Sequence, residues 1–304
     1  MSKLAKILVF LVAAASGCSK PAKPTPYYID RLQLSESTVQ RNPALAMSGD
    51  DLRVEAEAAF SRSRRFVLLA ATTKPRPADL KALRCRVELA FTRETLEEDG
   101  TSRAEIGAVL ELRRPGEVDR YQATGLGRAR FLATDHAARV PSFRKALAEA
   151  LDEAVKSGAL HLDALSKTDA ELIADLSSPD PRLRDYAVQV LADRKNAAAV
   201  PALMERLKDS DREVAMRAVG ALGAIGDPRA VSALIEMGQT RDPQFVIALI
   251  SVVAQLGGRD AEAFLFTLAS GHPEEAVRRA AQEAEERLKS ADAGHDGEAQ
   301  PRSP

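Results

Sequence analysis

The second half of the chain repeats itself every 31 residues, and this period limits its possible folds more than any other feature. Residues of the same type recur at that interval: Leu172 and Leu203, Leu176 and Leu207, Ala187 and Ala218, Val188 and Val219, Leu191 and Leu222, Val200 and Val231, and the series Asp180, Asp211 and Asp242. A fixed period of roughly 20 to 50 residues is typical of a solenoid, in which each unit buries its apolar face against its neighbours. The sequence therefore predicts a run of stacked repeats.

Each repeat contains two predicted helices, as in residues 182–193 and 199–208. Asp-Pro pairs stand where helices should begin, at Asp180, Asp227 and Asp242. An aspartate side chain accepts hydrogen bonds from the free amides of a first helical turn, and proline at the first helical position loses no hydrogen bond. We therefore interpret these aspartates as helix caps, in preference to metal ligands or catalytic acids.

The segment from Leu222 to Val231, Leu-Gly-Ala-Ile-Gly-Asp-Pro-Arg-Ala-Val, resembles the HEAT-like repeat of the phycobilisome-lyase type. The resemblance covers residues 166–289 and implies an all-α HEAT-like solenoid. It is specific for architecture and not for lyase activity, because most chains with these repeats are scaffolds. Related HEAT-like iron hydroxylases use adjacent His-Glu pairs, and no histidine here is followed by glutamate. Residues 290–304 are small and polar, which predicts a disordered tail.

Residues 27–162 alternate between strand and helix patterns. In one predicted strand, mostly charged residues alternate with apolar ones, which are Cys85, Val87, Leu89 and Phe91. Turns at residues 97–100 and 115–116 lead into two further strands, which predicts an antiparallel meander. A final helix has one apolar face: Val140, Phe143, Leu147, Ala150, Leu151 and Ala154. We expect an α+β N-terminal domain with helices on one face of the sheet.

This order of elements resembles the small α+β domain of the penicillin-binding-protein activator lipoproteins. The resemblance covers the strand, helix, strand, meander and closing helix of residues 27–162, and no single residue is diagnostic for it. It implies a domain that works in the bacterial cell envelope.

The segment 1–17 has the order of a secretory signal peptide, with two lysines before an apolar run at residues 7–15. That run is too short to span a bilayer. The step Ser16-Gly17-Cys18 resembles a bacterial lipobox, whose cysteine is lipidated and becomes the first residue of the mature protein. Ala15 stands where the family usually has leucine. Cleavage after residues 13–15 with simple secretion is the alternative.

Residues 18–26 form a polar, Pro-rich segment that suits a tether between a membrane and a folded domain. The lipoprotein resemblance implies acylation of Cys18 by three chains, and two or more chains suffice for stable anchoring. Ser19 resembles the outer-membrane sorting pattern. We therefore expect a protein anchored to the outer membrane by lipid on Cys18 and facing the periplasm.

Charge and composition argue against several kinds of partner. The 43 Lys and Arg residues nearly balance the 44 Asp and Glu residues, so the chain has no strong field to attract nucleic acid. Tryptophan is absent and aromatic residues make up 4%, which disfavours stacking platforms for bases or sugars. The sequence has no Gly-rich phosphate loop, paired-cysteine metal motif or Gly-x-Ser-x-Gly elbow. We predict no catalytic residues, no metal and no cofactor.

A candidate partner-binding surface lies in the third repeat. Residues 245–250 are all apolar, whereas the first repeat has Arg184 and Asp185 where the third has Val246 and Ile247. A helix that is apolar all round must be covered on both sides, either by its own chain or by a partner docked on Val246 and Ile247. We predict an adaptor that binds another envelope protein through its repeats. The alternative is an activator or subunit of a cell-envelope enzyme.

Overall fold

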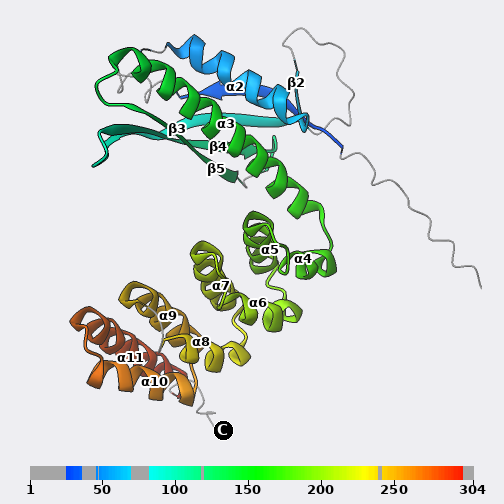
Figure 1. The fold of residues 1–304 in the computed structure, drawn as a ribbon. Coiled ribbons are helices and arrows are strands. Elements are labelled where there is room, and N and C mark those ends of the chain that lie inside the picture. Colours follow the sequence, from blue (N-terminus) through cyan, green and yellow to red (C-terminus); the bar gives the residue numbers. More distant parts are fainter. Residues whose placement is uncertain are drawn as a thin grey trace, which may run out of the picture.

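The computed structural model describes residues 25–35, 46, 48–69, 82–117, 120–238 and 242–296. Cys18 and most of the expected tether lie outside the described residues. The described chain forms an α+β domain followed by a curved row of helices, as expected from the sequence (Figure 1). No helix among the described residues is long and apolar enough to cross a membrane.

The sheet of the first domain has five strands in the order β2-β1-β3-β4-β5. Their bounds are β1 Tyr27–Leu34, β2 Phe66–Leu68, β3 Leu83–Leu96, β4 Thr101–Arg113 and β5 Arg120–Leu132. Strands β3, β4 and β5 form the antiparallel meander that the sequence predicts. Strand β1 runs parallel to both β2 and β3, a pairing that the local alternation does not specify.

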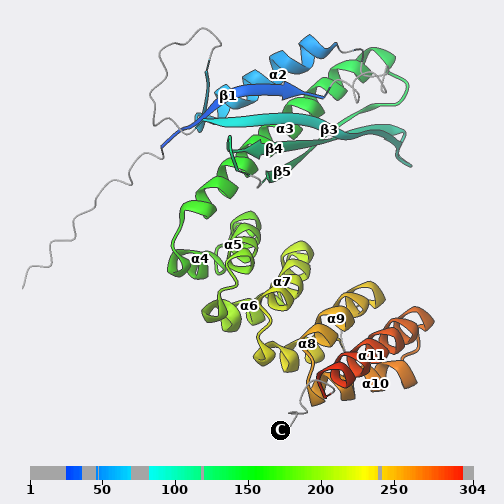
Figure 2. The ribbon, with the colours of Figure 1, turned by 180° about the vertical axis from the view of Figure 1, so that it is seen from behind.

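Helices α2 (Gly49–Ser63) and α3 (His136–Ser166) lie side by side on one face of the sheet (Figures 1 and 2). Ser48 caps α2 in a reciprocal arrangement with Asp51, which fixes where this helix begins. Helix α3 approaches β5 at two glycines, and a Cβ atom on Gly127 would lie 1.8 Å from the carbonyl oxygen of Ala146. Only glycine permits this contact between helix and strand.

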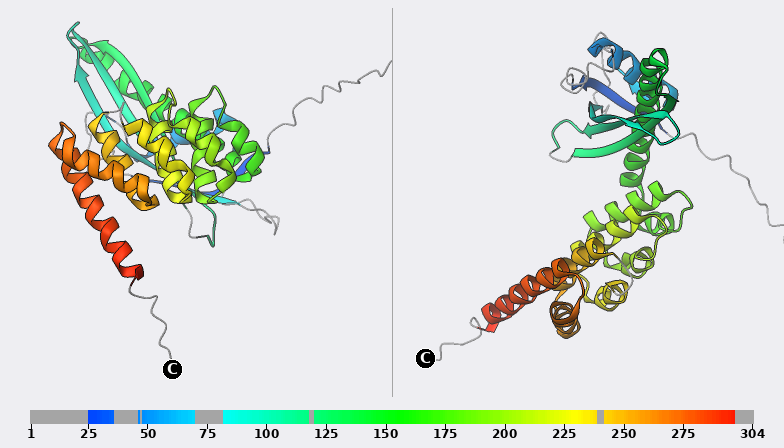
Figure 3. Two further views of the ribbon diagram at one scale, coloured as in Figure 1. Left: turned by 90° about the horizontal axis from the view of Figure 1, so that it is seen from below. Right: turned by 60° about the vertical axis from the view of Figure 1, so that its left-hand side comes forward.

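Helix α3 continues beyond the sheet and its last turns pack against the first repeat. The solenoid then contains α4 Asp169–Asp175, α5 Pro181–Asp193, α6 Val200–Arg206, α7 Arg212–Ile225, α8 Val231–Gly238, α9 Pro243–Leu256, α10 Arg259–Gly271 and α11 Glu275–Asp296. Figure 1 shows these helices curving beneath the sheet, and Figure 3 shows the row extending away from it. Helix α11 continues about two turns past Ser290, where the sequence predicts disorder.

The structure confirms the 31-residue register. The side chains of Asp180, Asp211 and Asp242 accept hydrogen bonds from the first-turn amides of α5, α7 and α9. Leu203 and Leu222 are fully buried, as expected for residues that repeat in a solenoid core. The repeats share one continuous apolar core that is distinct from the core between the sheet and its helices.

Candidate functional site

A groove of about 630 Å³ lies between the sheet, α3 and the first helix of the solenoid. Strand β5 supplies its floor, the middle of α3 supplies one wall, and α5 supplies another. In this part of the molecule, the outer edge of the sheet meets the start of the solenoid (Figure 1). The groove therefore combines surfaces from both domains.

The strand side of the groove follows from the register of β5. Ala133 donates its amide hydrogen to the carbonyl of Gly100, and the antiparallel register from there on is free of bulges. The backbone groups of odd-numbered residues of β5 consequently hydrogen-bond to β4, and even-numbered residues direct their N–H and C=O groups to the free edge. The side chains of Thr124, Leu126 and Arg128 lie on the sheet face opposite α3.

Apolar surface continues from this edge across the uncovered face of the sheet. Leu126 pairs with Gly107, and Gly107 pairs with Phe91 on the next strand. The Phe91 ring covers Gly107, where a Cβ atom would lie 2.5 Å from the ring, and Phe91 itself remains 41% exposed. Val109 lies beside this row and also lines the groove. A ligand in the groove would meet an apolar strip on this side.

The wall formed by α3 is acidic and polar. Glu149, Glu153 and Ser157 are four residues apart and therefore share one face of the helix. The Glu149 carboxylate accepts a hydrogen bond of 3.1 Å from the backbone amide of Arg128 on the free edge of β5. Glu153 lies 3.4 Å from the guanidinium of Arg182 on α5. Glu149 thus reaches across to the strand, and Glu153 reaches across to the solenoid.

The wall formed by α5 contributes Arg182, Asp185 and Tyr186. Burial raises the pKa of Asp185 above its usual range, although Arg217 of the next repeat pairs with it and opposes that shift. Burial also raises the pKa of the Tyr186 phenol. Hydrogen bonding to Asp180 raises the pKa of Arg182, which keeps this guanidinium charged. The solenoid side of the groove therefore presents charged side chains whose positions are fixed by ion pairs with neighbouring residues.

Three aromatic side chains connect the sheet to the solenoid behind the groove. The ring of His161 on α3 stacks on Tyr186 of α5 at a centroid distance of 4.6 Å. It also meets the edge of Tyr121 on β5 at 5.6 Å. Burial lowers the pKa of His161, and a hydrogen bond to the backbone of Gln122 opposes this shift. A buried neutral imidazole thus joins the two domains at one end of the groove.

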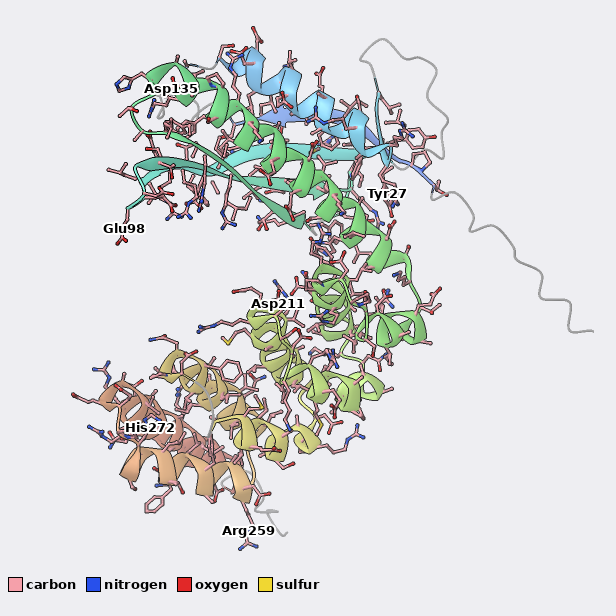
Figure 4. The ribbon with its side chains drawn as sticks, viewed as in Figure 1. Tyr27, Glu98, Asp135, Asp211, Arg259 and His272 are labelled. Carbon is pink, nitrogen blue, oxygen red and sulfur yellow. The ribbon has the colours of Figure 1, made fainter. Side chains whose placement is uncertain are left out.

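An ion-paired cluster lies further along the uncovered face of the sheet. Glu105 is 2% exposed and accepts hydrogen bonds from Arg93 and Arg128 at 2.6 Å and 3.0 Å. Those hydrogen bonds hold the pKa of Glu105 below its usual range. Figure 4 shows Glu98 at the tip of the β3–β4 hairpin. The basic end of the face is therefore largely neutralised by its own acids.

The predicted partner-binding residues do not form an exposed patch. Val246 is completely buried in the solenoid core and Ile247 is half-buried against it, which corrects the expectation of a docking surface there. Helix α9 packs against α7, α10 and α11, so the chain itself covers the apolar face. Arg184, at the equivalent position of the first repeat, is also buried, because it pairs with Asp209. This position is therefore buried in both repeats, whether it holds a charged or an apolar side chain.

The other singled-out side chains have structural surroundings. Cys85 is buried in the core of the first domain, and burial raises the pKa of its thiol. In the described parts of the chain, no group of three or more His, Cys, Asp or Glu side chains is arranged to hold a metal ion. The groove residues were not predicted, because they come together only when β5, α3 and α5 meet. The one sequence signal was the alternation of Thr124, Leu126 and Arg128 with small residues.

Comparison with known proteins supports the solenoid. A family model for HEAT repeats matches residues 170–250. The bilin biosynthesis protein PecE of Mastigocladus laminosus is 40% identical over 75 residues, which is 24% of this chain and 28% of that protein. The chain thus spans about a quarter of that relative's length. A crystal structure described as an engineered protein is 20% identical, covers 46% of this chain and 74% of its own, and has a TM-score of 0.33. The family match and the similarity to PecE support HEAT-like repeats in this part of the chain.

Proposed function

We propose that this protein is a lipid-anchored adaptor of the bacterial outer membrane that faces the periplasm and binds a segment of another envelope protein. The single observation that carries the binding role is the groove between the sheet and the HEAT repeats, which has an apolar floor and charged walls. Such concave sites with a few oriented polar groups are the usual places of ligand binding. HEAT solenoids present extended surfaces for proteins.

The anchoring role rests on the sequence around Cys18, which resembles a lipobox. Replacement of Cys18 by Ala should abolish acyl labelling and leave the protein as an unprocessed precursor or as a released form. The same variant keeps both folded domains, so a purified sample should still bind partners through the groove. Unchanged acyl labelling of the Cys18→Ala variant would end the lipoprotein proposal.

The binding role is tested by photo-crosslinking from membranes that contain the full chain. A photoreactive phenylalanine analogue at Thr124 faces the groove, whereas the same analogue at Val54 serves as a control on the exposed side of α2. We expect a specific crosslinked protein from position 124 and none from position 54. Equal yields from the two positions, or no product from either, would contradict the adaptor role. A captured enzyme would instead favour the role of an enzyme activator or subunit.

A second candidate function follows from the similarity to PecE, a protein named for bilin biosynthesis. On this second proposal the chain would bind a bilin, which is a linear tetrapyrrole. Titration of the protein with biliverdin, followed by visible absorption, tests this directly. A saturable spectral shift would favour bilin binding over the adaptor role.

A further inference from the structure

Side chains stand against the free edge of β5 at two points. At one point the buried imidazole of His161, which meets the edge of the Tyr121 ring, lies beside the backbone of Gln122. At the other, Glu149 accepts the backbone amide of Arg128 at 3.1 Å. Gln122 and Arg128 are both even-numbered residues of β5, and the register directs the backbone groups of such residues away from β4.

Between these two points lie Thr124 and Leu126, whose backbone groups face the groove. Within the part of the chain that the structure describes, their edge N–H and C=O groups have no hydrogen-bond partner. Each unpaired backbone group in a groove from which water is displaced costs free energy comparable to a lost hydrogen bond. A bound ligand must therefore provide alternating acceptors and donors at strand spacing, which is what an extended peptide does.

The walls of the groove determine how this edge is used. Native proteins usually protect a free edge strand, because it is a template for pairing with other chains. Here residues of α3 and α5 line the groove beside the edge, so an occupant of the groove contacts both helices. A groove of about 630 Å³ has room for a short extended segment. The edge thus faces a groove that can hold a short strand.

The side chains around the edge specify the occupant further. On the uncovered face of the sheet, Leu126 and the 41% exposed Phe91 form an apolar strip beside the position of an added strand. On the α3 side, Glu149 and Glu153 lie along the same edge; Glu153 pairs with Arg182 of α5, which leaves Glu149 as the main negative charge. Side chains alternate between the two faces of a strand. The complementary segment therefore alternates apolar side chains with basic ones.

We propose that the edge of β5 between Gln122 and Arg128 binds an extended segment of a partner protein as an added strand, and that this segment alternates apolar and basic side chains. This inference rests on the proposed adaptor function and specifies how its groove is occupied. On binding, a carbonyl of the segment replaces Glu149 at the Arg128 amide, and the released carboxylate pairs with a basic side chain of the segment.

The first test uses a synthetic probe, the fluorescein-labelled peptide Val-Lys-Val-Lys-Val-Lys-Val, and the full chain. Fluorescence anisotropy should show saturable binding of this peptide. A peptide of the same sequence with N-methylated backbone amides should lose most of its binding, since it cannot pair with the edge. The Val-Glu counterpart should bind more weakly, because Glu149 repels it. Equal binding of all three peptides, or no saturable binding of the first, would overturn the proposal.

The second test removes one edge donor without removing a bond to β4. Thr124→Pro deletes an amide that faces the groove, and proline is tolerated on an edge strand. Arg130→Pro is the matched control, because it deletes another edge-facing amide of β5 outside the groove and also follows an alanine. Thr124→Val tests the side chain alone. We expect roughly fivefold weaker peptide binding for Thr124→Pro only, the loss of one net hydrogen bond.

Thermal melting of the three variants reports whether each remains folded. If Thr124→Pro lowers the melting temperature more than Arg130→Pro does, hydrogen exchange of the wild type tests strand addition without a substitution. The amides of Thr124 and Leu126 should exchange faster than those of Ala123 and Gly125 in the free protein, and slow down when the peptide is bound. Edge amides that are already protected, or unaffected by the peptide, would exclude strand addition. Crosslinking from position 124 would still test the adaptor role independently.

Discussion

Removal of the Arg184 side chain should destabilise the solenoid more than removal of any exposed charge. The Arg184 guanidinium donates to both oxygens of Asp209 at 2.8 Å and 2.6 Å, and the Asp209 side chain is 1% exposed. When one partner of a buried ion pair is deleted and nothing else compensates the remaining charge, the cost is about 3–5 kcal/mol. Arg206, 3.4 Å from Asp209, and the Asp211 amide still compensate part of that charge, so we expect Arg184→Ala to lower the free energy of unfolding by about 2–3 kcal/mol.

The repeats themselves provide a compensating variant. The residue that corresponds to Asp209 in the preceding repeat is Ser178, whose hydroxyl accepts the amide of Asp180 just as Asp209 accepts the amide of Asp211. The double variant Arg184→Ala with Asp209→Ser therefore removes the buried charge and retains the turn. It should recover most of the stability that Arg184→Ala loses. Lys208→Ala, which removes an exposed pair with Glu236, should stay within about 0.5 kcal/mol.

Urea denaturation followed by circular dichroism measures these differences, and its pH dependence provides a further test. Burial opposes ionisation of Asp209, but the hydrogen bonds from Arg184 and the Asp211 amide, together with the charges of Arg184 and Arg206, outweigh it and lower the pKa of Asp209. A carboxyl with a lowered folded-state pKa contributes stability above its unfolded value, near pH 4, and loses it as the pH falls further. The deficit of Arg184→Ala should therefore shrink below about pH 4. A loss under about 1 kcal/mol at pH 7, or no recovery in the double variant, would refute the reasoning.

Three further predictions concern the packing that positions the groove. Gly127→Ala should destabilise the first domain by more than about 2 kcal/mol in chemical denaturation, because the new Cβ would meet the Ala146 carbonyl. As a contrast, Gly220→Ala lies in open space on α7 and should stabilise the solenoid by about 0.5–1 kcal/mol. Leu203→Ala should cost about 2–5 kcal/mol, and a loss below about 0.5 kcal/mol would contradict the repeat register. The pKa of His161 is lowered in the folded protein, so its contribution to stability is complete above its unfolded-state pKa, near 6.5, and decreases as the pH falls below that value. The melting temperature of His161→Phe should therefore depend less on pH below about 6.5 than that of the wild type.

The sequence specifies those parts of the fold that depend on local pattern. The capping aspartates, the meander and the long helix α3 were all predicted, because capping and amphipathic periodicity are encoded within a few residues. The parallel pairing of β1 with β3 was not predicted, because strand order depends on contacts between distant segments. The groove escaped prediction for the same reason. Its floor and its two walls are contributed by β5, α3 and α5.

The apolar run of the third repeat suggested a docking surface, and the role of Arg184, which occupies the equivalent position of the first repeat, explains why it is not one. Arg184 donates to the carbonyls of Ser178 and Pro179, and Arg278 of the last repeat donates in the same way to those of His272 and Pro273. The two are equivalent, although the last unit is displaced by one residue from the 31-residue period. The repeats between them have Ala215 and Val246 there, both fully buried.

Terminal units of a solenoid are atypical, because each lacks a neighbouring repeat on one side. Here the terminal units place arginine where the interior units place an apolar side chain, and each arginine ties the first helix of its unit to the preceding turn. The contrast between Arg184 and Val246 therefore distinguishes an end of the solenoid from its interior. A difference in polarity between repeats indicates a binding surface only where the residues are exposed, and in this chain an apolar strip beside the HEAT repeats belongs to the sheet, where Phe91 is exposed and Leu126 is half-buried.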